Sequence, residues 1–109
     1  MKPICEVNEW GDKRYLLNGL LHREDGPAFE SIDGDKEWFI NGDYHREDGP
    51  AVVRFNGTKL WYLNGYLHRE DGPAYENVNG VNSWYYHGRW IRCKDNQEFL
   101  RMIKLMIFL

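Results

Sequence analysis

Cysteine and surplus positive charge are both scarce in this chain of 109 residues. Cys5 and Cys93 are its two cysteines, near opposite ends of the sequence, and neither has the neighbouring His or Cys ligands of a zinc motif. We therefore expect free thiols, which suit a reducing compartment. Basic residues number 14 against 17 acidic ones, a net charge of -3, which argues against a surface built to neutralise a nucleic-acid backbone.

Long apolar runs are also missing from the start of the chain. Lys2, Pro3 and Glu6 interrupt the first few residues, so neither a secretory signal nor a membrane span is expected there. Hydrophobic residues make up 42% of the sequence, and 16% of it is aromatic, which suffices for one modest core. We predict a single domain over residues 1–109, located in the cytoplasm.

A regular repeat dominates the rest of the sequence. The motif HREDGP occurs at His22–Pro27, His45–Pro50 and His68–Pro73, with a step of 23 residues. The same step relates Gly34, Gly57 and Gly80, and likewise Trp38, Trp61 and Trp84. Self-similarity of this kind indicates a repeat architecture. We place the repeats at about 11–33, 34–56, 57–79 and 80–95, and the last of them has lost most of the motif, as the terminal unit of an array often does.

Each repeat has the pattern of a β-hairpin. Trp38–Ile40 is short and apolar and runs into Asn41-Gly42, a dipeptide that favours a type I′ turn. The return segment, Ala51–Phe55, is again strand-like. The fold class predicted is mainly β: an elongated antiparallel β-meander of 23-residue hairpin repeats, with seven or eight short strands. Equivalent residues in successive hairpins should lie roughly 10 Å apart.

A C-terminal capping α-helix is predicted over residues 96–109. Asp95 followed by Glu98 resembles a capping box, and apolar residues then continue to the end with few interruptions. At ~1.5 Å per residue the helix is long enough to lie across four strands. We expect it to dock on one face of the sheet; the alternative is a homodimer contact through its free apolar side.

Histidine, arginine and two acidic residues in succession would suit a catalytic or metal-binding site, but their repetition argues for a structural role. Histidines roughly 10 Å apart cannot share a metal ion that needs ligands at ~2 Å, and no serine or cysteine recurs at a fixed offset as a nucleophile. We predict no catalytic, cofactor or metal residue. Asp-Gly forms turns and glycine supplies a positive φ, while the charged side chains pair as a ladder within and between repeats. The structural residues are His22, His45, His68, Asp25, Asp48, Asp71, Gly26, Gly49 and Gly72.

Three groups of residues are candidates for binding. Arg23, Arg46 and Arg69, with nearby rings, would suit a phosphate or acidic group. Phe39, Tyr62 and Tyr85 project to one face as an exposed aromatic strip, unless sheet twist packs them into the core. Positions that differ between repeats are candidates for specificity: Asp43, Tyr66 and Arg89 after the turn, and Ser31, Arg54 and Asn77 in the return strand.

The units WFINGDYHREDGPA and WYLNGYLHREDGPA resemble the MORN repeat family, and more closely its variant arrays. The resemblance covers about Gly11 to Asp95, although the Y-x-G-x-W strand lacks its glycine and HREDGPA replaces the usual h-G-k-G segment. It implies an elongated sheet of hairpins used for protein contacts, dimerisation or, in some members, phospholipid binding. Such arrays are also similar to those of phage and giant-virus proteins.

We therefore expect a non-enzymatic protein–protein interaction module without cofactors, whose partner is another protein. The repeat type also suggests a small viral or phage inhibitor of a host factor, acting in the host cytoplasm. DNA binding and a membrane span are not expected. The alternative function is the binding of a small ligand, a nucleotide or phosphate, at the repeated edge of arginines and aromatic rings.

Overall fold

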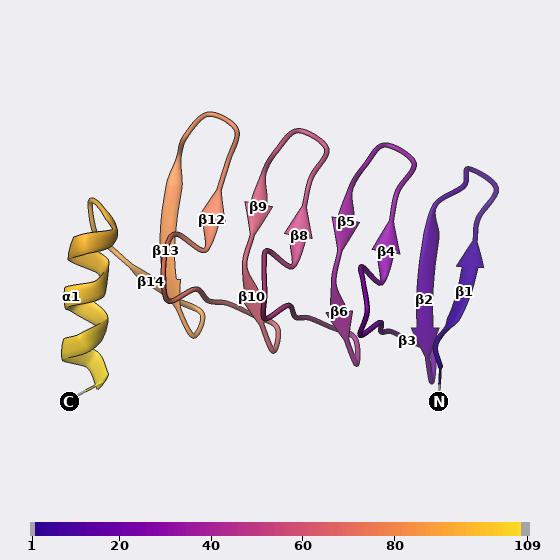
Figure 1. Cartoon of the computed structure of the whole chain (residues 1–109), viewed down its shortest axis with the longest axis horizontal. Helices are drawn as coiled ribbons and strands as arrows, with labels where there is room; N and C mark the ends of the chain where they lie inside the picture. Colours follow the sequence, from indigo (N-terminus) through magenta and orange to yellow (C-terminus); the bar gives the residue numbers. More distant parts are fainter. Residues whose placement is uncertain (1, 108–109) are drawn as a thin grey trace.

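Short antiparallel strands stand side by side along the chain, and one helix closes the array at its C-terminal end (Figure 1). This computed structural model describes residues 2–107. The strands are β1 (Ile4–Val7), β2 (Lys13–Leu17), β3 (Leu20–Leu21), β4 (Phe29–Glu30), β5 (Lys36–Glu37), β6 (Phe39–Ile40), β7 (Asp43–Tyr44), β8 (Val52–Val53), β9 (Lys59–Leu60), β10 (Tyr62–Leu63), β11 (Tyr66–Leu67), β12 (Tyr75–Glu76), β13 (Asn82–Tyr86) and β14 (Arg89–Ile91), and the helix is α1 (Asn96–Ile107). The molecule is flat and elongated, 47 × 32 × 17 Å.

The main sheet has the order β1-β2-β4-β5-β8-β9-β12-β13-β14, with β3 paired to β2. Two further hairpins, β6–β7 and β10–β11, lie below it (Figure 1). The predicted fold class is confirmed: a mainly β, antiparallel, meander-like array with a C-terminal helix. The strands are more numerous than the seven or eight expected for two reasons. The inner repeats divide one strand at its tryptophan, and the residues after each Asn-Gly or His-Gly turn form short strands of their own, β3, β7, β11 and β14.

The division at Trp38 has a simple cause. Its N–H donates to Ala51 O at 2.7 Å, whereas its carbonyl accepts from His45 N–H at 3.1 Å. The chain therefore changes its pairing partner at this residue, and one strand becomes β5 and β6. The equivalent strands at the two ends, β2 and β13, continue unbroken for five residues.

The Asn-Gly turns are as the sequence predicts. Asn41 and Gly42 have φ values of 50° and 84°, and a type I′ turn requires a positive φ at both residues. The same pair of positive φ values recurs at Asn18-Gly19, Asn64-Gly65 and His87-Gly88. These four turns form one edge of the array (Figure 1).

The helix begins as expected and docks differently from the expectation. Asp95 Oδ1 accepts the Glu98 N–H at 2.8 Å, which caps the first turn. Phe99 and Ile103 of α1 bury against Ile91, next to β13. The helix therefore packs on the last hairpin and runs beside the strands at the end of the sheet (Figure 1), although its length would allow it to lie across four strands of one face as the predicted docking envisaged.

The last two residues of the predicted helix, Phe108 and Leu109, lie outside the described residues. Within residues 2–107, no helix combines the length and the apolar character needed to cross a membrane.

Candidate functional site

Each HREDGP loop is organised around its arginine. The Arg46 guanidinium lies over the Trp38 ring, 4.0 Å from the ring centroid. Its Nε donates to Asp48 Oδ1 at 3.0 Å and its Nη1 donates to Pro50 O at 3.0 Å. The two hydrogen bonds hold the planar side chain flat against the ring. The arginine and the aspartate of the motif are thus explained by one arrangement, whereas Pro50 contributes a backbone carbonyl that any residue would supply.

The other two copies repeat this arrangement. Arg23 lies over Tyr15 at 4.0 Å and binds Asp25 and Pro27 O. Arg69 lies over Trp61 at 3.8 Å and binds Asp71 and Pro73 O. The arginine therefore already has an aromatic partner, a carboxylate and a carbonyl within its own loop.

The glycine of the motif has a different role from the one predicted. Gly26, Gly49 and Gly72 do not belong to the glycines with positive φ. A Cβ atom at Gly49 would lie 2.7 Å from the Arg46 Cζ, and the equivalent distances at Gly26 and Gly72 are 3.0 and 2.8 Å. Glycine is present because the guanidinium passes too close to the backbone for a side chain, so the expectation of a positive φ is wrong here.

The histidine of each loop binds the next repeat. His22 Nδ1 accepts the N–H of Asn41 at 2.9 Å, and His45 and His68 bind Asn64 and His87 in the same way at 3.0 and 2.7 Å. An Nδ1 atom that accepts a hydrogen bond carries no proton, so the ring is the neutral Nε2–H form. The histidines are structural acceptors that hold the next Asn-Gly turn, or its His87-Gly88 equivalent.

The charged side chains of the motif pair mainly inside one loop. Histidine Nε2 lies 3.8 to 3.9 Å from the glutamate two residues later, and each arginine pairs with its own aspartate. The predicted ladder of charges between motifs is therefore not what joins neighbouring loops. Backbone bonds do this: Arg23 N–H donates to Phe39 O, and Arg46 N–H donates to Tyr62 O, both at 3.1 Å.

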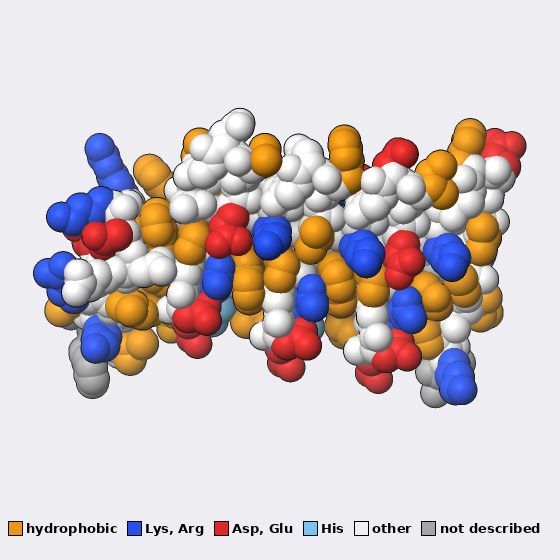
Figure 2. Space-filling view, turned by 45° about the horizontal axis from the view of Figure 1, so that its top comes forward, with side chains coloured by type: hydrophobic (Ala, Val, Ile, Leu, Met, Phe, Trp, Pro, Cys, Tyr) orange, Lys and Arg blue, Asp and Glu red, His pale blue; other side chains and the backbone are white. Residues whose placement is uncertain are grey.

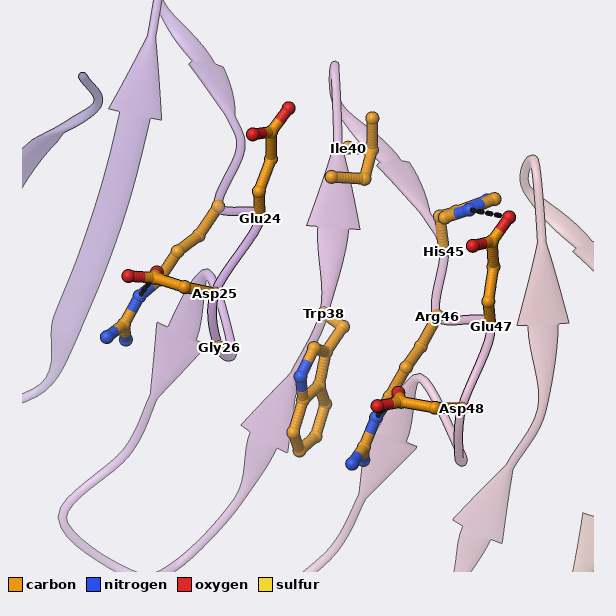
Figure 3. A pocket seen from close by; sticks show the side chains of 10 residues that line it. Glu24, Asp25, Gly26, Trp38, Ile40, His45, Arg46, Glu47 and Asp48 are labelled. Atoms are coloured by element: carbon orange, nitrogen blue, oxygen red, sulfur yellow. Dashed lines mark hydrogen bonds and ion pairs between the residues drawn. The ribbon is translucent and has the colours of Figure 1, made fainter.

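A cleft opens between the first and second motif. Trp38 and Ile40 form its floor, and residues 23–26 and 45–48 form its two walls (Figure 3). Its volume is about 800 Å³. A smaller cleft of about 280 Å³ lies at the equivalent place one repeat later, over Trp61 and Leu63. A third, of about 640 Å³, lies over Tyr15 and Leu17 beside Lys2 and Pro3. The clefts repeat with the motif.

The walls of these clefts expose acid rather than base. The side chains of the three arginines are 19% to 25% exposed, whereas the six carboxylates of the motifs are 69% to 87% exposed. Acidic side chains accordingly recur at regular steps along the array (Figure 2). Hydrogen bonding to Arg23 lowers the pKa of Asp25 below its usual value. The repeated edge thus offers an approaching molecule mainly negative charge.

The expected aromatic strip is not an exposed surface. Phe39 is buried and stacks on Tyr44 with ring centroids 4.4 Å apart. Tyr44 in turn lies 4.8 Å from Tyr62, and both Tyr62 and Tyr85 are half-buried. Burial raises the pKa of Tyr62, with a further contribution from Tyr85. Phe39 and Tyr62 pack through Tyr44, so these rings fit the alternative of core packing rather than an exposed strip.

Exposed apolar residues occur instead at the upper turns of the repeats, which connect β4 to β5, β8 to β9 and β12 to β13 (Figure 1). Ile32, Phe55 and Val78 occupy equivalent positions and are 63% to 72% exposed. Ile32 and Phe55 contact the glycine of the preceding turn, at 3.0 Å from a Cβ placed on Gly11 and 3.6 Å from one on Gly34. We call these three residues the turn tips. These residues were not among the predicted binding positions, although an apolar residue in a turn is itself an unusual signal.

The positions that vary after the lower turn are exposed as well. Asp43, Tyr66 and Arg89 are all exposed, and Tyr66 reaches the next turn, where its Cδ1 would lie 2.9 Å from a Cβ at Gly88. The return-strand positions behave differently: Ser31 and Asn77 close their own turns, whereas Arg54 pairs with the neighbouring strand β5. Ser31 Oγ accepts Asp35 N–H at 3.0 Å, Arg54 binds Glu37 at 2.7 Å, and Asn77 Oδ1 accepts Val81 N–H at 2.9 Å.

The cysteines and the metal-binding residue types add no second site. Cys5 is exposed and Cys93 is half-buried, and both are free thiols. Burial raises the pKa of Cys93, and Glu98 and Asp95 raise it further, which favours the unreactive thiol. Over residues 2–107, no three His, Cys, Asp or Glu side chains form a group that could hold a metal ion.

In comparisons with known proteins, no protein-family pattern, no curated sequence and no solved structure matches the chain significantly. Any proposal about function therefore rests on the geometry described above.

Proposed function

We propose that the chain is a non-enzymatic module that binds another protein through the exposed positions of its repeat array. The observation that carries this proposal is a division of labour within the repeat. Residues that recur in each repeat bind one another: arginine lies on an aromatic ring, histidine accepts from a turn, and alanine is fully buried. Several positions that differ between repeats, among them Phe55 and Tyr66, are exposed, whereas Phe39 and Val52, which also differ, are buried.

The turn tips support a protein partner in particular. Three large apolar side chains at one step along an edge, with Trp10 also 66% exposed beyond the first of them, give a surface of the kind that protein contacts cover. Resemblance to MORN arrays agrees with such a role. The alternative, a phosphate held by the arginines, is less well supported, because each guanidinium already binds a carboxylate and a carbonyl oxygen.

The test compares capture of partners by the wild-type chain and by a triple variant of the turn tips, Ile32→Ser with Phe55→Ser and Val78→Ser. These side chains are exposed, so the variant should keep the far-UV circular dichroism of the wild type. We expect a partner that purified wild-type protein binds directly, and that the triple variant binds at least about tenfold more weakly.

A matched control replaces equally exposed apolar residues elsewhere, Ile4→Ser with Leu105→Ser. The control should keep the partner. Loss of binding in both variants would point to general stickiness rather than a site. A clear, saturable thermal stabilisation by one nucleotide, with no protein bound directly, would contradict the proposal and favour the small-ligand alternative.

A further inference from the structure

The cleft between the first and second motif carries net negative charge. Four carboxylates, from Glu24, Asp25, Glu47 and Asp48, line it against the two guanidinium groups of Arg23 and Arg46, which leaves a formal charge of -2. His45 in the same wall is neutral, because its Nδ1 accepts the Asn64 N–H. The charge sign is therefore opposite to that of a phosphate site.

Two of these carboxylates are available to a ligand. Asp25 and Asp48 each bind the arginine of their own loop. Glu24 and Glu47 have only a histidine Nε2 nearby, at 3.9 and 3.8 Å, which is beyond hydrogen-bond distance. Both glutamate side chains are 84% exposed. They belong to the two motifs that form the walls of the cleft (Figure 3), about 10 Å apart, so a cation between them would be attracted by both carboxylates.

The floor of the cleft suits the other half of a long basic side chain. Trp38 and Ile40 are apolar and lie between the walls (Figure 3). Arginine and lysine pack their aliphatic stems on apolar surface and keep the charged head among polar groups. The protein itself provides an example of an arginine that binds an aromatic ring and a carboxylate together: the Arg46 guanidinium lies 4.0 Å from the centroid of the Trp38 ring, and its Nε donates to Asp48.

We infer that this cleft binds an arginine or lysine side chain of a partner polypeptide, with the stem on Trp38 and Ile40 and the charged head between Glu24 and Glu47. The inference rests on the proposed function and names the chemistry of the partner. The apolar floor favours a side chain over a bare metal ion.

The repeat sets the spacing of the basic residues in the partner. Two strands of the main sheet separate equivalent positions, which gives about 10 Å per repeat at ~4.8 Å between strands. The 47 Å length of the molecule agrees with nine strands at this spacing and a helix about 10 Å wide. The next cleft, over Trp61, has Glu47 and Glu70 in its walls. Two basic side chains about 10 Å apart would therefore enter neighbouring clefts.

A polyproline II segment meets this requirement. Its residues i and i+3 project from the same side, about 9 Å apart. Along an extended β-strand, side chains on one side are separated by about 7 Å or about 13 Å, and neither matches. The occupant is thus a proline-rich segment with basic residues three apart.

The experiment measures binding of labelled synthetic peptides to the full chain by fluorescence anisotropy. The first peptide has the order Pro-Arg-Pro-Pro-Arg-Pro, and two controls of the same composition place the arginines two or four residues apart. A fourth peptide replaces arginine with glutamate. We expect saturable binding of the first peptide, about threefold or more weaker binding of the altered spacings, and no binding of the acidic peptide.

Two pairs of variants distinguish binding in the cleft from non-specific attraction of a basic peptide to an acidic protein. Glu24→Gln with Glu47→Gln removes the two available carboxylates, and Glu9→Gln with Asp33→Asn removes two exposed carboxylates from the turns at the other edge. We expect the first pair to weaken binding about fivefold to tenfold and the second by less than about twofold. Glu24→Asp with Glu47→Asp should restore part of the affinity.

Several results would overturn the inference. Equal weakening by both pairs of variants, or equal affinity for all three arginine spacings, would mean non-specific attraction to an acidic protein. Absence of saturable binding, or preference for the acidic peptide, would mean that the cleft does not take cations. In either case a partner that depends on the turn tips would leave the proposed function standing, so the two failures are distinguishable.

Discussion

The repeats and the C-terminal cap are stabilised in different ways. In the repeats the fully buried side chains are small, namely Ala28, Ala51 and Ala74, together with Val52. In the cap the fully buried side chain is Phe99, which packs with Ile91 and Ile103. One region depends on polar contacts made at fixed distances, and the other on apolar burial.

The difference follows from the shape of the array. A sheet 17 Å deep with one layer of strands leaves little volume for a core. Each repeat instead binds the next through directional groups: a histidine Nδ1, an arginine N–H and, at the upper turn, Asp35 Oδ1, which accepts the Phe55 N–H at 2.8 Å. These bonds leave the surface free to vary, whereas the cap needs one apolar cluster.

The largest expected effect is in the cap. Phe99→Ala should lower the free energy of unfolding by about 3–5 kcal/mol, because a fully buried ring is removed from the apolar cluster that holds the described part of α1. Urea unfolding and the helical signal at 222 nm measure it. Leu100→Ala is the matched control, since Leu100 is 42% exposed and should cost less than about 1 kcal/mol. Equal losses would mean that α1 is not anchored by Phe99.

Next in size is the link between repeats. His68→Ala leaves the His87 N–H without its acceptor at a part-buried position, and loss of this hydrogen bond together with the buried ring should cost about 1–3 kcal/mol. His68→Asn keeps an acceptor oxygen near the place of Nδ1 and should recover about half of the loss. Urea midpoints of the two variants provide the measurement. If asparagine and alanine have the same effect, packing rather than the hydrogen bond is what His68 contributes.

A smaller effect is expected inside the loop. Arg46→Lys keeps the charge but loses the planar group that binds Asp48 and Pro50 O together, at a cost of about 1 kcal/mol. Arg54→Lys keeps a positive charge near Glu37 and Asp35, at a position where the arginine is 37% exposed, and should cost about half as much or less. The comparison fails if the order of the two losses in thermal unfolding is reversed.

The smallest effect is the dependence on pH. Burial lowers the pKa of His68 below its usual value of 6.5, and His87 lowers it further against the opposing pull of Glu70. The unfolded chain therefore takes up a proton near pH 6.5 that the folded chain takes up only at lower pH. The free energy of unfolding should fall as the pH drops from about 6.5 through the folded pKa, and should not change through this group above pH 6.5. His68→Asn should flatten this part of the curve; an unchanged slope would assign the effect to other groups.

Several features of the fold could be predicted from the sequence, because they depend on local chemistry. Asn41-Gly42 has the residues that a positive φ favours, and Asp95 with Glu98 has those of a helix start. The partition of the inner strands at Trp38 could not be predicted, since it depends on which carbonyl the Trp38 N–H meets across the sheet. The docking place of α1 also required the tertiary structure, as an apolar helix fits any apolar face.

The candidate site was predicted less well than the fold. Asp25 and His22 were placed among the structural residues, and their contacts agree with such a role. The sign of the exposed charge could not be predicted, because Arg23 and Asp25 have equal and opposite formal charges in the sequence. Only the stacking of Arg23 on Tyr15 shows that the arginine is covered and the acids are not.

The sequence by itself determined the length of the unit, its turns and its terminal helix, because φ preferences and capping act over a few neighbouring residues. Only the tertiary structure determined which side chains of the recurring motif make intramolecular contacts and which remain exposed to solvent. The reason is physical: a side chain becomes buried or exposed through the neighbouring strand and the following repeat, which lie 7 to 23 residues away along the chain.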